Sequence, residues 1–266
     1  MTAPENSDDA VMLDVRNGTP ALLFPRQFSI LLRMQLVRFR TAWRRYIIIS
    51  SAMPLGIIVL LRVRGPAPAA QAVQFVAGGI VLATALSALT FLAQRMAWMK
   101  ANRIFDYYNT LPTSTVLLVL AVLVSFFVFA LPGVLAITII GCLIFGVPLV
   151  LSVDILWAAA TLVVGGIALA GIGTLIGLLA RDEHLAGTYA NLAMMAVLFL
   201  AIVPSSDFPR LMRPALFLVP SSYMVDSFKL TLTGTVRPVE LTLDLLGTAC
   251  FAFLTMLWST RVLRTR

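Results

Sequence analysis

The stretch from residue 107 to residue 153 contains no charged side chain and consists mainly of leucine, valine, isoleucine, phenylalanine and alanine. About 20 apolar residues are enough for a helix to cross a bilayer core of about 30 Å. The rest of the chain is similar, with 60% hydrophobic residues, 12% charged residues and a mean hydropathy of +0.95. Soluble domains carry about twice this share of charged residues. The sequence therefore predicts an all-α integral membrane protein and excludes the soluble globular and disordered classes.

Charge-free runs predict six transmembrane helices. The run at 107–153 leaves two possibilities open, because it could form one long span or a hairpin broken at Pro132-Gly133. The six predicted spans are approximately 46–61, 72–94, 115–141, 155–180, 185–204 and 245–260.

The distribution of basic residues favours an even number of spans with both ends in the cytoplasm. With six spans, fourteen of the 20 basic residues lie inside and six outside, in agreement with the positive-inside rule. An additional span would remove most of this asymmetry. Residues 1–24 are rich in acidic residues and have no apolar core, which predicts a disordered cytoplasmic tail instead of a signal peptide. We therefore expect a multi-pass protein of the cytoplasmic (inner) membrane.

The segment 25–45 is too basic to span a bilayer, but it has a helical pattern. Phe28, Leu32, Leu36, Phe39 and Trp43 fall within about 80° of one another on a helical wheel. Such a segment is expected to lie flat on the inner leaflet and to contact a cytoplasmic partner, although a plain positive-inside anchor is the alternative. The predicted interfacial residues are Arg26, Phe28, Arg33, Leu36, Arg40, Trp43 and Arg44.

The loop after the second predicted span mixes basic and aromatic side chains. Protein docking surfaces are enriched in arginine and aromatic residues, so this loop is a candidate surface for a cytoplasmic partner. An ordinary aromatic belt at the membrane interface is the alternative. The candidate docking residues are Arg95, Trp98, Lys100, Arg103, Phe105, Asp106 and Tyr107.

The segment 204–234 contains four prolines, which divide it into helical pieces too short to span. We expect a partly inserted, broken helical hairpin before the last span, and a plain extracellular loop is the alternative. Its marked residues are Pro204, Pro209, Pro220, Tyr223, Lys229 and Gly234.

Two further patterns concern packing and transport. Gly173 and Gly177 form a Gly-x-x-x-Gly motif, which predicts close helix packing within the subunit. The predicted span centres hold no charge for an ion or proton relay. Neutral polar residues could therefore line a transport path, and the candidates are Thr84, Ser87, Ser125, Thr138 and Asn191.

Taken together, these features resemble the permease subunits of ABC type-2 exporters over residues 22–262. The resemblance rests on the basic helix before the spans, on the loop ending in Leu111-Pro112, and on the Pro220-Ser-Ser-Tyr223 element followed by Lys229 and Gly234. It implies a bacterial permease domain over 46–262 that exports a hydrophobic or amphipathic compound, such as a drug, an antibiotic or a lipid-like molecule. Polysaccharide or glycolipid export, or a passive channel or anchor subunit, are the alternatives.

The resemblance also implies the partners. A separate ATP-binding-cassette ATPase would dock near 96–112, and a second permease copy or a paralogue would complete a homodimer or heterodimer. Membrane lipids would surround the spans, and no nucleic acid is expected. The chain has no Gly-x-x-x-x-Gly-Lys-Ser/Thr phosphate loop, so we expect no enzyme activity and no bound cofactor, with ATP and magnesium held by the ATPase.

Overall fold

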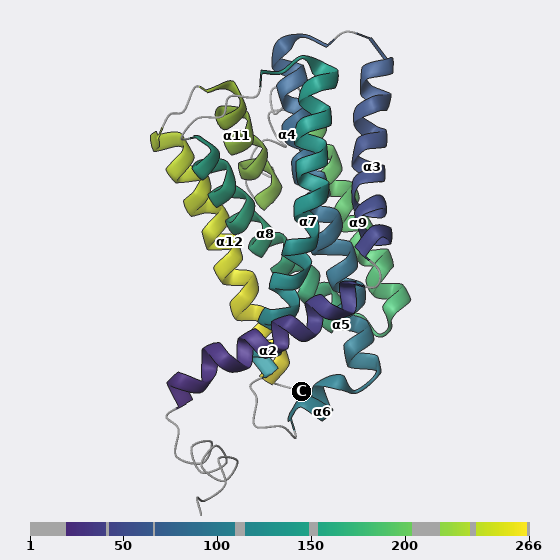
Figure 1. Ribbon diagram of the computed structural model, residues 1–266, viewed down its shortest axis with the longest axis vertical. Coiled ribbons are helices and arrows are strands. Elements are labelled where there is room, and N and C mark those ends of the chain that lie inside the picture. Colours follow the sequence, from purple (N-terminus) through teal and green to yellow (C-terminus); the bar gives the residue numbers. More distant parts are fainter. Residues whose placement is uncertain are drawn as a thin grey trace, which may run out of the picture.

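A computed structural model describes residues 20–40, 43–65, 67–109, 115–148, 154–203, 219–234 and 238–264, and within these ranges every regular element is helical. The predicted tail at residues 1–19 lies outside the described residues. The elements form an elongated bundle (Figure 1). They are α2 Pro20–Arg40, α3 Trp43–Val63, α4 Ala69–Ala85, the π-helix η1 Leu86–Phe91, α5 Leu92–Ala101, α6 Ile104–Asn109, α7 Thr115–Phe145, α8 Asp154–Leu179, α9 Glu183–Ile202, α11 Pro220–Thr233 and α12 Pro238–Arg264.

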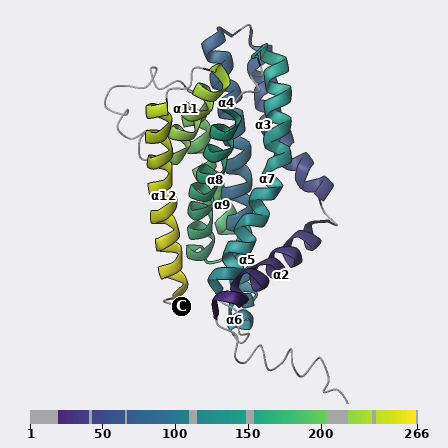
Figure 2. The ribbon, with the colours of Figure 1, turned by 60° about the vertical axis from the view of Figure 1, so that its left-hand side comes forward.

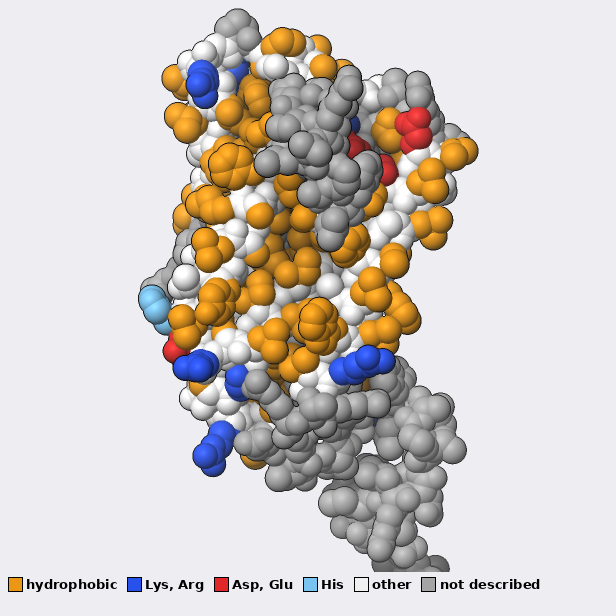
Figure 3. Space-filling model, turned by 180° about the vertical axis from the view of Figure 1, so that it is seen from behind, with side chains coloured by type: hydrophobic (Ala, Val, Ile, Leu, Met, Phe, Trp, Pro, Cys, Tyr) orange, Lys and Arg blue, Asp and Glu red, His pale blue; other side chains and the backbone are white. Residues whose placement is uncertain are grey.

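Five helical segments of the described chain are long and apolar enough to cross a membrane. In α3 the described apolar part is the shorter segment Ser50–Val63. Hydrophobic side chains cover the middle of the bundle, and basic side chains gather toward its two ends (Figure 3). The expected all-helical, multi-pass membrane architecture is thus confirmed. The five segments are Ala69–Ala101, Leu117–Phe145, Ile155–Leu179, Glu183–Ile202 and Val239–Ser259.

Helix α7 shows whether the charge-free stretch at 107–153 forms one long span or a hairpin. It continues through Pro132 as a single helix of 31 residues, so the hairpin alternative is wrong. A break at this depth would leave backbone N–H and C=O groups without partners in hydrocarbon, whereas a proline inside a continuous helix frees only the groups around it. Gly133, the next residue, faces Ser50 of α3 so closely that an added Cβ would lie 3.2 Å from the serine Oγ.

The core is centred on α4 and η1, where every residue from 76 to 90 is buried. Helix α8 packs directly against this central segment by means of its glycines. A Cβ on Gly173 would collide with the carbonyl oxygen of Ala88, and one on Gly177 would collide with that of Ala93. The prediction that the Gly-x-x-x-Gly motif serves packing inside the subunit is confirmed.

The second span contains an irregularity that apolar periodicity does not reveal. Between α4 and α5 the chain forms the π-helix η1. In a π-helix each backbone N–H bonds to the carbonyl oxygen five residues earlier, instead of four as in an α-helix. Ala88, the contact of Gly173, lies inside η1. Gly173 of α8 therefore packs on the π-helical turn, and Gly177 packs on the α-helix α5 that follows it.

Helix α2 crosses the end of the bundle obliquely, where α5 and α6 also lie (Figures 1 and 2). It begins at Pro20 and ends at Arg40, so the predicted range of 25–45 is shifted by five residues. Pro20 occupies the first helical position, the place at which proline is tolerated, and Trp43 and Arg44 belong to the start of α3. The last helix is also longer than predicted, because α12 begins at Pro238 and continues to Arg264.

Candidate functional site

The candidate docking loop is a sharp turn between α5 and α6. Asn102 closes the end of α5, since both its backbone N–H and its side-chain Nδ2 donate to the carbonyl oxygen of Trp98, at 3.0 and 2.8 Å. Arg103 follows with a left-handed φ of 53°, the only positive φ among the described non-glycine residues. Few non-glycine residues adopt this conformation, which costs of order 1 kcal/mol or more. The turn thus holds α6 in a fixed direction relative to α5.

Two candidate docking residues on α5 contact each other. The guanidinium carbon of Arg95 lies 4.4 Å from the centre of the Trp98 ring, a cation–π arrangement. Trp98 also packs against the hydrophobic core. This contact fixes the direction of the Arg95 side chain along the helix.

Lys100 is directed toward α8. Its ammonium nitrogen donates to the carbonyl oxygens of Leu178, at 2.9 Å, and Ala180, at 2.7 Å. The last carbonyls of a helix have no partner within the helix, and the negative end of the helix dipole favours a cation there. Lys100 therefore ties the docking loop to the end of α8.

The turn between α8 and α9 is brought to the same end of the molecule, and the sequence reading gave it no docking role. Ala180 and Ala186 pack with Ala97 of α5 in a small hydrophobic cluster. The carboxylate of Asp182 caps α9 by accepting from the backbone N–H of Leu185 at 2.8 Å. An N-cap aspartate ahead of an apolar run is a signal that could have located this turn. Its exposed side chains are Arg181, Asp182, Glu183 and His184.

The remaining docking candidates differ in their accessibility. Arg103 is exposed, and Tyr107 is exposed over 64% of its surface. Phe105 is half-buried and packs against the hydrophobic core. The side chain of Asp106 lies outside the described residues. Arg103 and Tyr107 are therefore the candidates most available to a partner, and they share this end with the α8–α9 turn.

The predicted apolar face of helix α2 packs against the protein core. Phe28 and Leu32 are half-buried and pack against the core, and Leu31 beside them is buried. Leu36 is half-buried, and Arg26 and Arg33 are exposed. The side chains of Arg40, Trp43 and Arg44 lie outside the described residues.

The second half of the predicted hairpin is the helix α11. Pro220 lies in its first turn, and Gly234 ends it with a left-handed φ of 65°, as is common at helix C-termini. Pro204 and Pro209, which mark the first half, lie outside the described residues. The helical character of 220–233 agrees with the prediction.

Two side chains of α11 anchor it to the long helices. Tyr223 lies over Gly247 of α12, where an added Cβ would be 3.1 Å from the ring, and it also contacts Phe251 with ring centres 6.5 Å apart. Met224 is fully buried and occupies the space left by the missing side chain of Gly165 on α8. Glycines on two neighbouring helices thus create the space in which α11 is seated.

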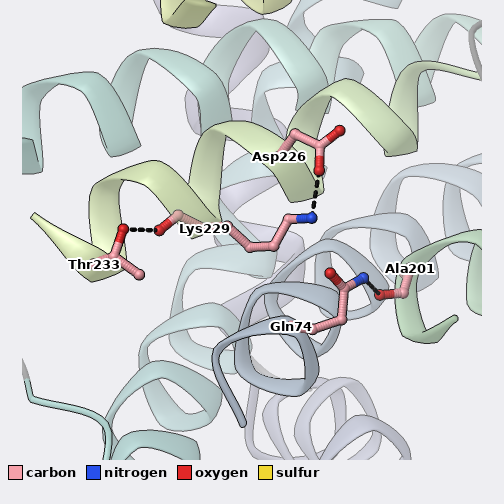
Figure 4. Close-up of polar contacts among 5 residues, drawn as sticks. All are labelled: Gln74, Ala201, Asp226, Lys229 and Thr233. Carbon is pink, nitrogen blue, oxygen red and sulfur yellow. Dashed lines mark hydrogen bonds and ion pairs between the residues drawn. The ribbon is translucent and has the colours of Figure 1, made fainter. Parts of the chain in front are cut away.

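Polar contacts in this region lie within α11 and between α4 and α9 (Figure 4). Lys229 and Asp226 form an ion pair one helical turn apart, and both are partly exposed. Gln74 of α4 is buried, and its Nε2 donates to the carbonyl oxygen of Ala201 on α9 at 2.8 Å. The second contact satisfies one of the last carbonyls of α9 inside the bundle.

The described residues bring no three histidine, cysteine or carboxylate side chains together as a metal site. Of the two cysteines, Cys142 is buried and Cys250 is exposed. Thr84 and Ser87 border one cavity, whereas Ser125, Thr138 and Asn191 are not in its wall. The five neutral residues proposed from the sequence therefore do not all line this space.

The model of a family described as ABC-2 family transporter protein matches residues 44–260, which include all but the first residue of α3, the helices α4 to α11 and most of α12. No curated protein matches the chain. The matched range leaves α2 outside.

Proposed function

Because the chain belongs to the ABC-2 transporter permease family, we propose that it is the transmembrane subunit of an exporter driven by a separate ATP-binding-cassette ATPase. Family membership implies association with such an ATPase. The 266 residues contain no phosphate loop of the Gly-x-x-x-x-Gly-Lys-Ser/Thr type. ATP and magnesium would therefore bind to the partner, and this chain would supply the path across the membrane.

The observation that carries the docking proposal is the construction of the α5–α6 turn. Arg103 and Tyr107 are exposed there, while Asn102 and Lys100 hold the turn against α5 and the end of α8. A motion imposed on this turn would reach α5 and α8 together, since Lys100 joins them. Rigid-body shifts of packed helices are a common way of transmitting such a motion.

Helix α2 is proposed to lie in the membrane interface beside this turn. Ile30, Met34 and Val37 are exposed and lie on the same helical face, next to the exposed Arg26 and Arg33. An apolar stripe beside arginines suits the boundary between acyl chains and anionic head groups. The face toward lipid would thus be this stripe, because Phe28 and Leu32 pack on the core.

We propose six spans, with α3 as the first and both chain ends in the cytoplasm of a bacterial inner membrane. Helix α3 has 21 residues and lies alongside the spanning helices (Figure 1). The α3–α4 connection lies at the opposite end of the bundle from α6 and the C-terminal end of α12 (Figure 1). This arrangement suits an even number of crossings.

The proposed cargo is hydrophobic or amphipathic, in the class of drugs, antibiotics or lipid-like molecules. Supporting this, the predicted span centres carry no ionisable side chain that could serve a proton or ion relay. A polysaccharide or glycolipid would be the second cargo class, and a passive channel or anchor subunit the alternative function. A second copy or a paralogue would complete the transporter.

Affinity purification in mild detergent, with proteomic identification of bound proteins, tests this function directly. We expect an ATP-binding-cassette ATPase to co-purify, and ATP hydrolysis to require that subunit. ATP hydrolysis by the isolated chain would contradict the proposal. So would purification of the chain without an ATPase from membranes of cells that also express the neighbouring genes.

A further inference from the structure

A cavity of about 100 Å³ lies between three helical segments in the middle of the bundle. The α4–η1 segment supplies Thr84, Ser87 and Ala88, and α7 and α8 supply the rest of the wall, which is apolar. An engineered apolar cavity of about 150 Å³ binds benzene, so a space of this size is sufficient for a small apolar group.

The cavity has an open side and a closed side. Val124 on α7 and Val163 and Ile167 on α8 border it with exposed fractions of 37%, 43% and 36%. The opposite wall contains Thr84 and Ser87, each only 1% exposed. Because the exposed residues belong to two candidate membrane-spanning helices, the opening would face the bilayer in the membrane-embedded protein.

Ser87, a residue of the closed wall, has an unsatisfied hydroxyl. Its buried Oγ has no hydrogen-bond partner among the described residues. The neighbouring Thr84 differs, because its hydroxyl donates to the carbonyl oxygen of Ile80 at 2.9 Å. A buried polar atom without a partner is costly, and native proteins rarely keep one without a reason.

Water is a poor occupant for this space. An ordered buried water needs two to four polar partners. The wall offers only the hydroxyls of Thr84 and Ser87, and Thr84 has already donated its proton to Ile80, in otherwise apolar surroundings. An apolar group that carries one acceptor atom would pack against the apolar wall and accept a hydrogen bond from the Ser87 hydroxyl.

We infer that this cavity binds the apolar portion of a membrane-dissolved amphiphile, which enters between α7 and α8 and accepts a hydrogen bond from Ser87. Such a group is found both in bilayer lipids and in small hydrophobic solutes. The inference concerns binding alone, and it holds whether or not the bound molecule is exported.

Photolabelling in lipid nanodiscs tests the inference without ATP or an ATPase, so the result does not depend on the proposed transport function. One arm uses azioctanol, a small alcohol carrying a diazirine, and a second arm uses a phospholipid with a diazirine on its acyl chain. Peptide mass spectrometry should locate adducts at the buried wall residues Leu123, Phe126 or Ala170, which bulk lipid does not contact. Labelling by one probe alone supports the site and identifies its occupant as a small solute or a lipid.

Three variants complete the test. Ala130→Leu fills the cavity and should abolish these adducts. Ser87→Ala should weaken azioctanol labelling below saturation about three- to tenfold, as expected for one lost hydrogen bond. The control is Thr174→Val on α8, whose buried hydroxyl donates to Ala170 and which does not line the cavity; it should label as the wild type does.

Failure of Ala130→Leu to fold would leave the Ser87→Ala comparison in place. The inference is overturned if neither probe labels the buried wall residues Leu123, Phe126 and Ala170. Equal azioctanol labelling of Ser87→Ala and wild type would also overturn it.

Discussion

The ammonium nitrogen of Lys100 lies 2.7 Å from the carbonyl oxygen of Ala180, so a side chain of the candidate docking loop holds the end of α8. The same nitrogen reaches Leu178. These hydrogen bonds join the docking loop directly to the α8–α9 turn, so the two should move together, although 80 residues separate Lys100 from Ala180.

Replacing Lys100 by methionine should destabilise the protein. The change keeps the aliphatic chain but removes the donor to two helix-terminal carbonyls, which costs about 1–3 kcal/mol of unfolding free energy. Thermal unfolding of the purified protein in detergent measures the loss. Arg103→Asn is the control, because it removes one exposed positive charge at the same end and should change the melting temperature little.

Replacing Gly173 by alanine should be strongly destabilising even though alanine favours helix. The added methyl would collide with the carbonyl oxygen of Ala88, and overpacking of this kind typically costs about 1–3 kcal/mol or more. Gly56→Ala is the matched control, because nothing lies within 4 Å of the position that its Cβ would take. That variant should be neutral or more stable by up to about 1 kcal/mol. Equal melting temperatures would show that α8 does not rest on η1 as described.

The double variant Arg103→Asn, Tyr107→Ala should release the ATPase. Asparagine tolerates the left-handed backbone at residue 103, so the turn keeps its conformation while the charge is lost. Loss of hot-spot residues commonly weakens an interface by more than about 1 kcal/mol each, and co-purification should fall at least about tenfold. Arg62→Asn, an exposed arginine at the end of α3, should retain the ATPase; equal recovery in both variants would argue against docking here.

The two polar contacts Gln74–Ala201 and Lys229–Asp226 (Figure 4) should contribute differently to the free energy of unfolding. Gln74→Leu leaves the buried carbonyl oxygen of Ala201 without its side-chain donor and should cost about 1–3 kcal/mol. Lys229→Met removes a partly exposed ion pair and should cost less than about 1 kcal/mol. Chemical or thermal unfolding of both variants makes the comparison, and a larger effect at Lys229 would contradict it.

Cysteine accessibility should place both described chain ends on the cytoplasmic side. In a Cys142→Ala, Cys250→Ala background, Pro20→Cys and Arg264→Cys should react only after the membrane is permeabilised. Arg64→Cys and Thr233→Cys, at exposed positions, should react from outside with an impermeant maleimide. Labelling of residues 20 and 264 from opposite sides would exclude six spans.

The sequence was most informative where hydrophobicity alone decides the structure. The second, fourth and fifth apolar runs correspond to helices whose ends differ from the prediction by few residues, except where α5 continues to Ala101 beyond the bilayer. Hydrophobicity could not show whether α7 breaks at Pro132, because a buried hairpin and a long span have the same composition. That outcome follows from the cost of unpaired backbone groups in hydrocarbon.

The contacts of the candidate site were harder to predict from the sequence, because they join residues that lie far apart in the chain. A basic residue in an aromatic loop predicts an exposed charge, yet Lys100 finds two carbonyls on a helix distant in sequence. Phe28 and Leu32 have the spacing of a lipid-facing stripe, but helix α2 meets the bundle on that side and exposes Ile30, Met34 and Val37 instead. Periodicity identifies the faces of a helix but does not say which neighbour each face will meet.

The π-turn at Leu86–Phe91 also affects how relatives of this chain should be aligned. A π-turn accommodates one more residue than an α-turn, so the α-helices on either side keep the relative rotation they would have without it. Deleting one residue within 86–91 would restore regular α-helix and leave Arg95, Trp98 and Lys100 facing the same directions. The same deletion in 69–85 or 92–94 would turn those side chains by about 100° around the axis relative to the start of the span. Length variation in the second span should therefore be tolerated at this turn and selected against on both sides of it.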